Sequence, residues 1–314
     1  MLEQIFTITF LTTFLTASVR MAVPIIFAGL GETFSEKAGI LNIGLEAIML
    51  SGAFASFAFT YITGSLWVGL VGGMLGGLVV SLIHGLFSVY MRKDQTVTGI
   101  ALNMLMLGTT SFMFKVLVSS NPNFPQIDTF GKIEIPVLSK IPIIGQAFFN
   151  QDIIVYASYV LITLSVILLY RTTWGLSFTA VGEHPRAADT VGIQVYKTRY
   201  LAATINGILG GIGGAYLTLV QLGVFMENVT AGRGYIALAV VIFGKRHPIG
   251  VFLGALLFGA ADAFQFRLQA IGIELPSQYL TMLPYVVTLA VLLFSAKNSR
   301  DPQSLGKPYI SDAR

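Results

Sequence analysis

Long apolar runs alternate with short polar stretches along almost the whole chain. About 20 apolar residues are enough for a helix to cross a bilayer, and backbone inside lipid must satisfy its own hydrogen bonds. The pattern therefore predicts an all-α polytopic transmembrane bundle of about nine helices (range eight to ten), forming a single domain over residues 1–314. The nine runs lie near residues 5–30, 39–64, 66–91, 95–120, 152–170, 199–222, 233–244, 249–266 and 278–296.

Basic residues gather in the loops on one side of this alternation. The positive-inside rule makes that side cytoplasmic. A loop at about 171–198 is then cytoplasmic, a stretch at about 119–151 is external, and the C-terminus lies in the cytoplasm. Twelve of the 19 lysines and arginines belong to this set: Arg92, Lys93, Arg171, Arg186, Lys197, Arg199, Lys245, Arg246, Lys297, Arg300, Lys307 and Arg314.

Three stretches depart from a simple series of spans. Arg20 and Pro24 interrupt the first run; we favour one helix, with the N-terminus outside and nine spans, over two short helices and ten spans. The run 233–244 is short for a crossing and predicts a hairpin with 249–266. The external apolar piece Ile141–Phe149 is also too short to span, so we expect a re-entrant or interfacial segment there.

Composition agrees with a membrane protein that is not an enzyme. Apolar residues make up 54% of the chain and charged residues 11%, against about 25% charged residues in soluble domains. There is no cysteine, and His84, His184 and His247 lack metal-ligand spacing. No phosphate-binding G-x-x-x-x-G-K-[ST] loop occurs. We expect no catalytic residue, metal or cofactor, and the net charge of +4 requires no nucleic-acid partner.

Polar side chains inside the apolar runs are candidates for a solute pathway. Asn42 and Glu46 are four residues apart, which would place them on one helix face, and an ionisable residue within a span indicates a functional site by default. The same pair could instead bind neighbouring helices and fix their packing. Asn103 and Asn206 lie in other runs, where interhelical hydrogen bonds are the commoner role, although a pore lining needs such groups too.

The cytoplasmic stretch 182–193 predicts a short helix. Pro185 suits the first helical position, and Gly192 suits the stop. Such a helix could fit a groove on a separate ATPase, or it could be an ordinary amphipathic surface helix.

If this helix docks on the ATPase, each of its side chains has an expected role in the contact. Ala187 and Ala188 are expected to be exposed and to allow close approach. Arg186 and Asp189, three residues apart on one face, would set the orientation of the partner.

Taken together, these stretches resemble one family. The pattern G-E-x-x-x-E-[RK]-A-G-x-L-N-I-G-L-E-G is matched at 31–47, G-E-N-P-x-A-A-x-x-x-G-I at 182–193, and G-R-G-Y-I-A-L-A-x-x-I-F-G-[KR] at 232–245, with a small-residue run at 207–216. From about residue 20 to about 296 the chain looks like the permeases of bacterial ABC importers for nucleosides, within the branched-chain amino acid and ribose permease group. Two residues depart from the patterns: Ala47 replaces glycine, and His184 replaces asparagine, a much better helix N-cap.

The resemblance implies a four-part importer in the bacterial cytoplasmic membrane. This chain would be the shorter of two different permeases, an ATPase with two nucleotide-binding halves would lie in the cytoplasm, and a substrate-binding lipoprotein would deliver the nucleoside outside. Asn42, Glu46, Asn103 and Asn206 are our predicted pathway residues. The implied ATPase-coupling residues are Gly182, Glu183, Pro185, Arg186, Ala187, Ala188, Asp189 and Gly192.

Three alternatives stay open at this point. One is a permease of the same group for a simple sugar or a branched-chain amino acid. Another is an ion-driven secondary transporter, which would need paired carboxylates within the spans, and few are present beyond Glu46 and Asp262. The third is a structural membrane subunit, which the polar residues within the runs argue against.

Overall fold

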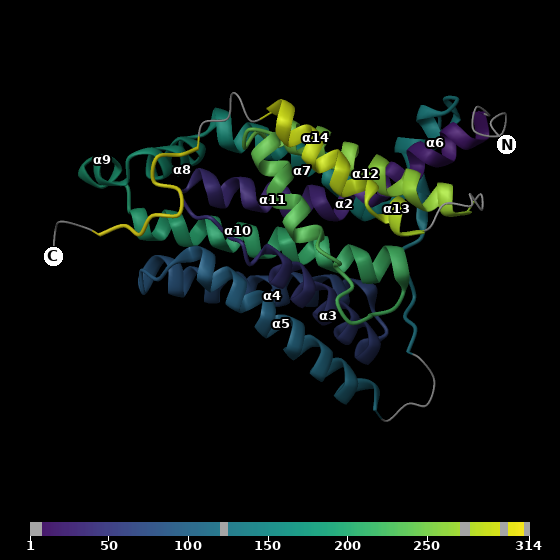
Figure 1. The fold of residues 1–314 in the computed structure, drawn as a ribbon, viewed down its shortest axis with the longest axis horizontal. Helices are drawn as coiled ribbons and strands as arrows, with labels where there is room; N and C mark the ends of the chain where they lie inside the picture. Colours follow the sequence, from purple (N-terminus) through teal and green to yellow (C-terminus); the bar gives the residue numbers. More distant parts are fainter. Residues whose placement is uncertain (1–7, 120–124, 271–276, 296–300, 311–314) are drawn as a thin grey trace.

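The computed structural model describes residues 8–119, 125–270, 277–295 and 301–310. Within these ranges the chain is a bundle of helices with one pair of three-residue strands (Figure 1). In chain order the elements are α2 (Ile8–Lys37), α3 (Leu45–Thr63), α4 (Leu66–Gly85), η1 (Leu86–Tyr90), α5 (Gln95–Val118), β1 (Lys132–Glu134), η2 (Leu138–Lys140), α6 (Ile144–Phe149), β2 (Asn150–Asp152), α7 (Ile153–Arg171), α8 (Thr173–Glu183), α9 (Pro185–Thr190), α10 (Val195–Tyr216), η3 (Leu217–Leu222), α11 (Arg233–Phe243), α12 (Pro248–Ala270), α13 (Ser277–Thr281) and α14 (Leu283–Ser295).

Helix α10 lies in the middle of the bundle. It packs against α2, α3 and α4, and in Figure 1 it separates the layer of α3, α4 and α5 from the layer that contains α2, α7 and α12. Its glycines make this close packing possible. A Cβ atom on Gly211 would collide with the backbone of Gly73 in α4, and one on Gly214 would collide with the backbone of Met49 in α3.

Each of the nine predicted runs contains a helix, but the helices differ in length. Among the described residues, seven are long and apolar enough to cross a membrane: α2, α3, α4 with η1, α5, α7, α10 with η3, and α12. Helix α11 has 11 residues and α14 has 13, so nine spans stay a prediction. Pro24 lies inside the continuous helix α2, as the one-helix interpretation required. The N-terminus itself lies outside the described residues.

The second predicted run becomes helical later than expected. Helix α2 ends at Lys37, residues 38–44 are non-helical, and α3 begins at Leu45. The prediction that Asn42 and Glu46 share a helix face is therefore wrong. The side-chain oxygen of Asn42 accepts the backbone N–H of Gly44 at 3.0 Å, and this local turn competes with helix formation.

The external stretch folds into a small substructure. Strand β1 pairs antiparallel with β2, with Ile133 opposite Gln151, and the short helix α6 lies between them in sequence. Helix α6 has six residues, so the predicted segment Ile141–Phe149 is indeed too short to cross a bilayer. This part lies at the end of the bundle opposite α9 (Figure 1).

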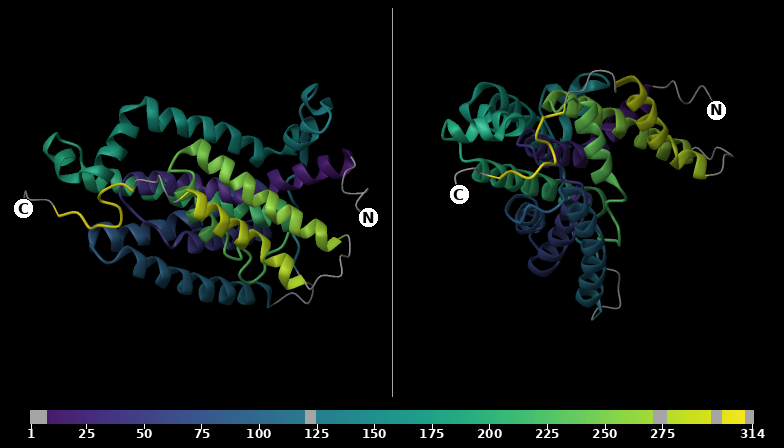
Figure 2. Two further views of the ribbon diagram at one scale, coloured as in Figure 1. Left: turned by 45° about the horizontal axis from the view of Figure 1, so that its top comes forward. Right: turned by 60° about the vertical axis from the view of Figure 1, so that its left-hand side comes forward.

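The loop predicted at 171–198 contains two helices rather than one. Helix α8 follows α7 almost directly, because the Thr172 side chain caps it by accepting the Gly175 N–H; the sequence analysis did not predict it. The C-terminal segment, residues 301–310, lies at the same end as α8 and α9 (Figures 1 and 2). We call this the inner end, since the predicted orientation places it in the cytoplasm, and the opposite end the outer end.

Candidate functional site

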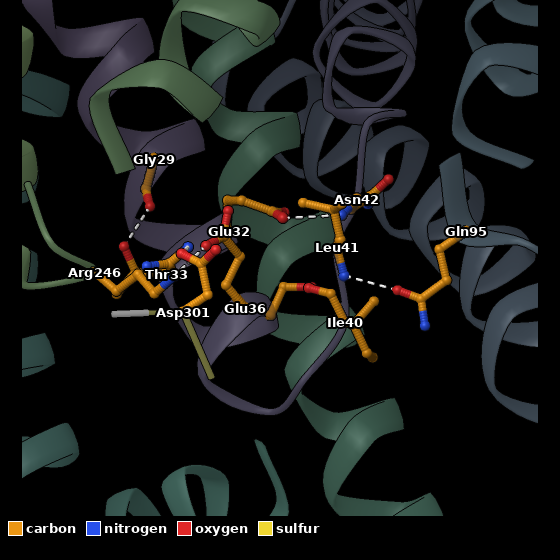
Figure 3. Close-up of polar contacts among 11 residues, drawn as sticks. Gly29, Glu32, Thr33, Glu36, Ile40, Leu41, Asn42, Gln95, Arg246 and Asp301 are labelled. Carbon is orange, nitrogen blue, oxygen red and sulfur yellow. Dashed lines mark hydrogen bonds and ion pairs between the residues drawn. The ribbon is translucent and has the colours of Figure 1, made fainter. Parts of the chain in front are cut away.

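Glu32 connects three elements near the inner end of α2. It is 0% exposed. Its Oε1 accepts the backbone N–H of Asn42 at 2.9 Å, and its Oε2 accepts the side-chain amide of Asn206 in α10 at 2.6 Å. On the other side of segment 38–44, the Gln95 side chain accepts the N–H of Leu41 at 2.8 Å (Figure 3). Glu32 therefore fixes the path of a buried, non-helical segment.

Glu46, in the first turn of α3, holds the beginning of α11. Its Oε1 accepts the Thr230 hydroxyl at 2.5 Å and the Gly232 N–H at 2.8 Å, and its Oε2 accepts the Gly234 N–H at 2.7 Å. The first N–H groups of a helix have no partner within it, and the positive end of the helix dipole favours an anion. These contacts explain how a carboxylate that is only 7% exposed is accommodated between spanning helices.

Asn103 joins α5 to the same place. Its side-chain oxygen accepts the N–H of Ala47 at 2.9 Å, and its amide donates to the Ile43 carbonyl at 3.0 Å and to the Tyr235 hydroxyl at 2.8 Å. Asn103 is partly exposed and Tyr235 is 47% exposed. Tyr235 is not among the predicted pathway residues, although a tyrosine within the short apolar run 233–244 is a visible signal.

The group around Glu46 lies some distance along the bundle from the inner end. Tyr235 precedes Lys245, in the turn at the inner end, by ten residues. At about 1.5 Å per helical residue, the separation along the helix is about 12–15 Å. The apolar core of a bilayer is about 30 Å thick, so the predicted orientation, with Lys245 at the inner surface, would place the exposed phenol near the middle of that core.

The four predicted pathway residues therefore fall into two groups. Asn42 and Asn206 meet at Glu32, whereas Glu46 and Asn103 meet at the start of α11. All four make hydrogen bonds within the chain, as the packing interpretation expected. In the second group, Asn103 and Tyr235 leave a polar edge open to the surface.

A charged cluster closes the inner end beneath these groups. Arg246, in the turn between α11 and α12, pairs with Glu36 of α2 at 2.5 Å and with Asp301 of the C-terminal segment at 2.7 Å (Figure 3). The side chains of Arg246 and Glu36 are 6% and 0% exposed. Three elements far apart in sequence are thus joined by one guanidinium group.

Helix α9 forms where the sequence predicted a short helix. It begins at Pro185, and Gly192, with a φ of 88°, lets the chain turn away after it. His184 occupies the N-cap position without a capping side-chain hydrogen bond, in line with its departure from the family's asparagine.

The two alanines of α9 differ. Ala187 is exposed, as predicted, but Ala188 is only 3% exposed and packs with Val181, Val195 and Tyr309. The prediction that Ala188 is exposed before assembly is wrong. A helix lying on a surface has one covered face, and Ala188 points into it.

The remaining predicted coupling residues lie just before or within this helix. Gly182 is buried, and a Cβ atom at this position would collide with the Lys37 carbonyl. Glu183 accepts the Gln303 N–H at 3.4 Å. Arg186 is exposed, and Asp189 is partly exposed.

The C-terminal segment covers the inner face of α8 and α9, which the sequence analysis did not foresee. The Ser304 hydroxyl donates to the Gly182 carbonyl at 2.5 Å, and the Tyr309 hydroxyl donates to the Asp189 carboxylate at 2.6 Å. Arg199, counted above among the basic loop residues, is 0% exposed and donates to the Lys307 carbonyl at 3.1 Å. No hydropathy signal distinguishes this polar segment from an ordinary tail.

The fold resembles that of a known transporter class. A solved structure described as an inward-facing conformation of a metal-chelate type ABC transporter aligns with a TM-score of 0.50, covering 90% of this chain and 84% of that one. The sequence identity is 14%, so this likeness concerns the fold alone. Together with the seven helices of the described residues that are long and apolar enough to cross a bilayer, this fold is that of a multi-pass membrane protein.

The family follows from the sequence comparison. Residues 14–296 match the model described as the permease component of the branched-chain amino acid transport system, and the chain belongs to this family. It is 39% identical to the guanosine ABC transporter permease protein NupQ of Bacillus subtilis, over 95% of this chain and 96% of that protein. The nucleoside permease protein NupC of Lactococcus lactis is 38% identical (91% and 93% covered), and TsgC13 of Haloferax volcanii, named as a glucose permease protein, is 34% identical (90% and 91% covered).

Proposed function

We propose that this chain forms half of the pore of an ATP-driven importer for nucleosides. The observation that carries the proposal is its similarity, over more than nine-tenths of its length, to permease proteins named for guanosine and for nucleosides. A simple sugar is the second candidate, because the relative named for glucose is 34% identical over a similar length. The L-N-I-G-L-E sequence within 31–47 favours the nucleoside.

The other parts of the importer would be separate subunits. Because the chain has no phosphate-binding loop, ATP would be hydrolysed by an ATPase with two nucleotide-binding halves at the inner end. A second, different permease would complete the pore, and a substrate-binding lipoprotein would release the nucleoside at the outer end. The coupling element for the ATPase would be α9, on which Arg186 and Ala187 are exposed.

The pathway would run past the open edge of the group around Glu46. Asn42, Glu46 and Asn206 would shape its wall by fixing segment 38–44 and the start of α11, while Asn103 and Tyr235 would face the solute. A phenol exposed near mid-membrane is poorly suited to lipid but well suited to a base, because stacking on an aromatic ring contributes about 1–3 kcal/mol per base. The hydrogen bond from Asn103 holds the phenol oxygen in place.

Substitution of Tyr235 tests this pathway. Tyr235→Leu removes the ring, and we expect the KM for guanosine uptake to rise about tenfold, which corresponds to about 1.4 kcal/mol. Tyr235→Phe keeps the ring and loses only the hydrogen bond to Asn103, so its effect should be smaller. Tyr279→Leu, at a tyrosine on α13 that is 67% exposed, is the matched control. An unchanged KM in Tyr235→Leu would exclude Tyr235 from the pathway.

The proposed function is tested by reconstitution. The chain is placed in vesicles with its ATPase, the second permease and the receptor protein, and uptake of labelled guanosine is followed. We expect uptake that requires ATP, is suppressed by other nucleosides and is unaffected by excess glucose. Suppression by glucose would favour the sugar, and uptake driven by an ion gradient without ATP would contradict the proposal. The purified chain alone should hydrolyse no ATP.

A further inference from the structure

The C-terminal segment, residues 301–310, is packed as part of the fold. Ser304 and Tyr309 are 7% and 5% exposed. Its backbone also takes part, since the Gly306 N–H donates to the Gly39 carbonyl at 3.2 Å and the Ser304 N–H donates to the Gly182 carbonyl at 3.0 Å. The segment thus contacts α8, α9 and the connection between α2 and α3 at once.

Arg199 links the packing of the C-terminal segment to the helix bundle. Its guanidinium group, at the start of α10, is bound by the Lys307 carbonyl and by the Ser304 hydroxyl, at 3.1 and 3.4 Å. A buried cation without hydrogen-bond partners is strongly unfavourable. The arginine and the segment therefore require each other, and α10 is the helix at the centre of the bundle.

The segment also provides a polar connection of α9 to the rest of the inner end. Helix α9 has six residues. The hydroxyl of Tyr309 binds its Asp189, while the carbonyl of Tyr309 accepts the Tyr196 hydroxyl of α10 at 3.3 Å. At the other end of the segment, Asp301 binds Arg246 in the turn between α11 and α12. A displacement of α9 would thus be passed to α10 and to that turn.

A surface pocket lies between α9 and this segment. It has a volume of about 480 Å³ and is lined on one side by residues 183–187 and on the other by residues 303–304 and 307–310. Lys307 and Ile310 are exposed at its rim, Ile310 by 54%. The pocket is continuous with the exposed face of α9 that carries Arg186 and Ala187.

We propose that α9 and residues 301–310 together form the docking surface for the ATPase, and that the C-terminal segment carries the motion of α9 to α10 and to the α11–α12 turn. The inference rests on the proposed function, because it takes the ATPase as the partner of α9. A partner that binds α9 would also occupy the pocket beside it. About half of the residues that line this pocket belong to the C-terminal segment. The segment is then both a contact for the ATPase and a link to the pore helices.

The experiment changes only the exposed side chains of the segment. Lys307→Glu keeps the backbone carbonyl that binds Arg199, and Ile310→Asp alters a side chain that is more than half exposed. Lys93→Glu, at an exposed lysine between η1 and α5 and outside the pocket, is the charge-matched control. Each variant is expressed with the other subunits, and co-purification of the ATPase and of the second permease is measured separately.

We expect Lys307→Glu and Ile310→Asp each to weaken ATPase binding about tenfold, which corresponds to about 1.4 kcal/mol, while both retain the second permease. Lys93→Glu should bind the ATPase normally. A photo-crosslinking amino acid at position 310 should label the ATPase. Because the variants must still pair with the second permease, a folding defect is recognised independently.

The outcomes separate the two proposals. If both variants bind the ATPase normally and position 310 gives no crosslink, while Ala187→Arg abolishes binding, the docking surface is α9 alone and the inference is wrong. If the wild-type chain binds no ATPase and transports without one, the proposed function itself fails.

Discussion

Two ion pairs at opposite ends of the bundle differ in their burial. At the inner end, Arg246 and Glu36 form an ion pair whose side chains are 6% and 0% exposed, and Asp301 joins the same guanidinium. At the outer end, Lys115 of α5 pairs with Glu227 at 3.0 Å, but these side chains are 71% and 51% exposed. An exposed pair contributes little to stability, whereas a buried pair is costly to break.

The two pairs also differ in the number of elements that they join. The buried charges of the inner end lie where α2, the α11–α12 turn and the C-terminal segment meet, and Arg199 adds α10 to this assembly. At the outer end, the Lys115–Glu227 pair joins only α5 to the loop before α11 and remains in contact with solvent. Force applied at the inner end would therefore reach several spanning helices.

The largest effect is expected from breaking the inner ion pair. Arg246→Ala leaves the Glu36 carboxylate buried without its cation, and removal of one partner of a buried pair typically costs about 3–5 kcal/mol. The thermal unfolding temperature of the detergent-purified chain should fall accordingly. Arg246→Lys keeps the charge but loses the guanidinium group that binds Glu36 and Asp301 together. Its unfolding temperature should therefore lie between those of the alanine variant and the wild type. An unchanged unfolding temperature in Arg246→Ala would remove the contrast between the two ion pairs.

An intermediate effect is expected at the start of α11. Glu46→Gln places an amide NH₂ where a carboxylate oxygen now accepts an N–H group, and leaving a buried donor unsatisfied costs about 1–3 kcal/mol. Glu227→Gln, at the exposed carboxylate, is the matched control and should change stability much less. Both can be compared by the same unfolding measurement. Equal losses would show that the two carboxylates are equivalent.

The smallest effect is expected at the outer pair. Lys115→Ala removes an exposed ion pair, and such pairs are worth about 0.2–1 kcal/mol. The unfolding temperature should hardly move, and added salt should reduce even that difference because exposed charges are screened. A loss as large as that of Arg246→Ala would contradict this prediction.

Hydropathy predicted where the helices lie because burial in lipid leaves few alternatives to a helix. It did not predict the helix ends. Asn42 falls within the second apolar run, but its side chain forms a local turn with Gly44. Hydropathy cannot detect such a turn, because the turn does not change the number of apolar residues in the run. Helix α8 was missed because it follows α7 after a single non-helical residue, Thr172.

The sequence predicted several residues of the candidate site but not which of them contact one another. The motif stretches contained Glu46 and α9, yet which residues meet depends on pairings across the bundle, such as Asn103 with Tyr235. The burial of Ala188 depends on Tyr309, which is more than a hundred residues away in sequence. Contacts of that kind cannot be inferred from local periodicity.

The central claim, that the inner end is the coupling end, is tested most directly at Ala187. This residue is exposed on α9, whereas Ala188 beside it is packed, so Ala187→Arg changes the docking face without overfilling the interior. ATP hydrolysis and guanosine uptake are measured together in vesicles that hold the complete complex. We predict that the variant stays in the membrane with the second permease but loses the uptake that ATP hydrolysis drives. Normal uptake with a normal ratio of ATP hydrolysed to guanosine imported would contradict the account.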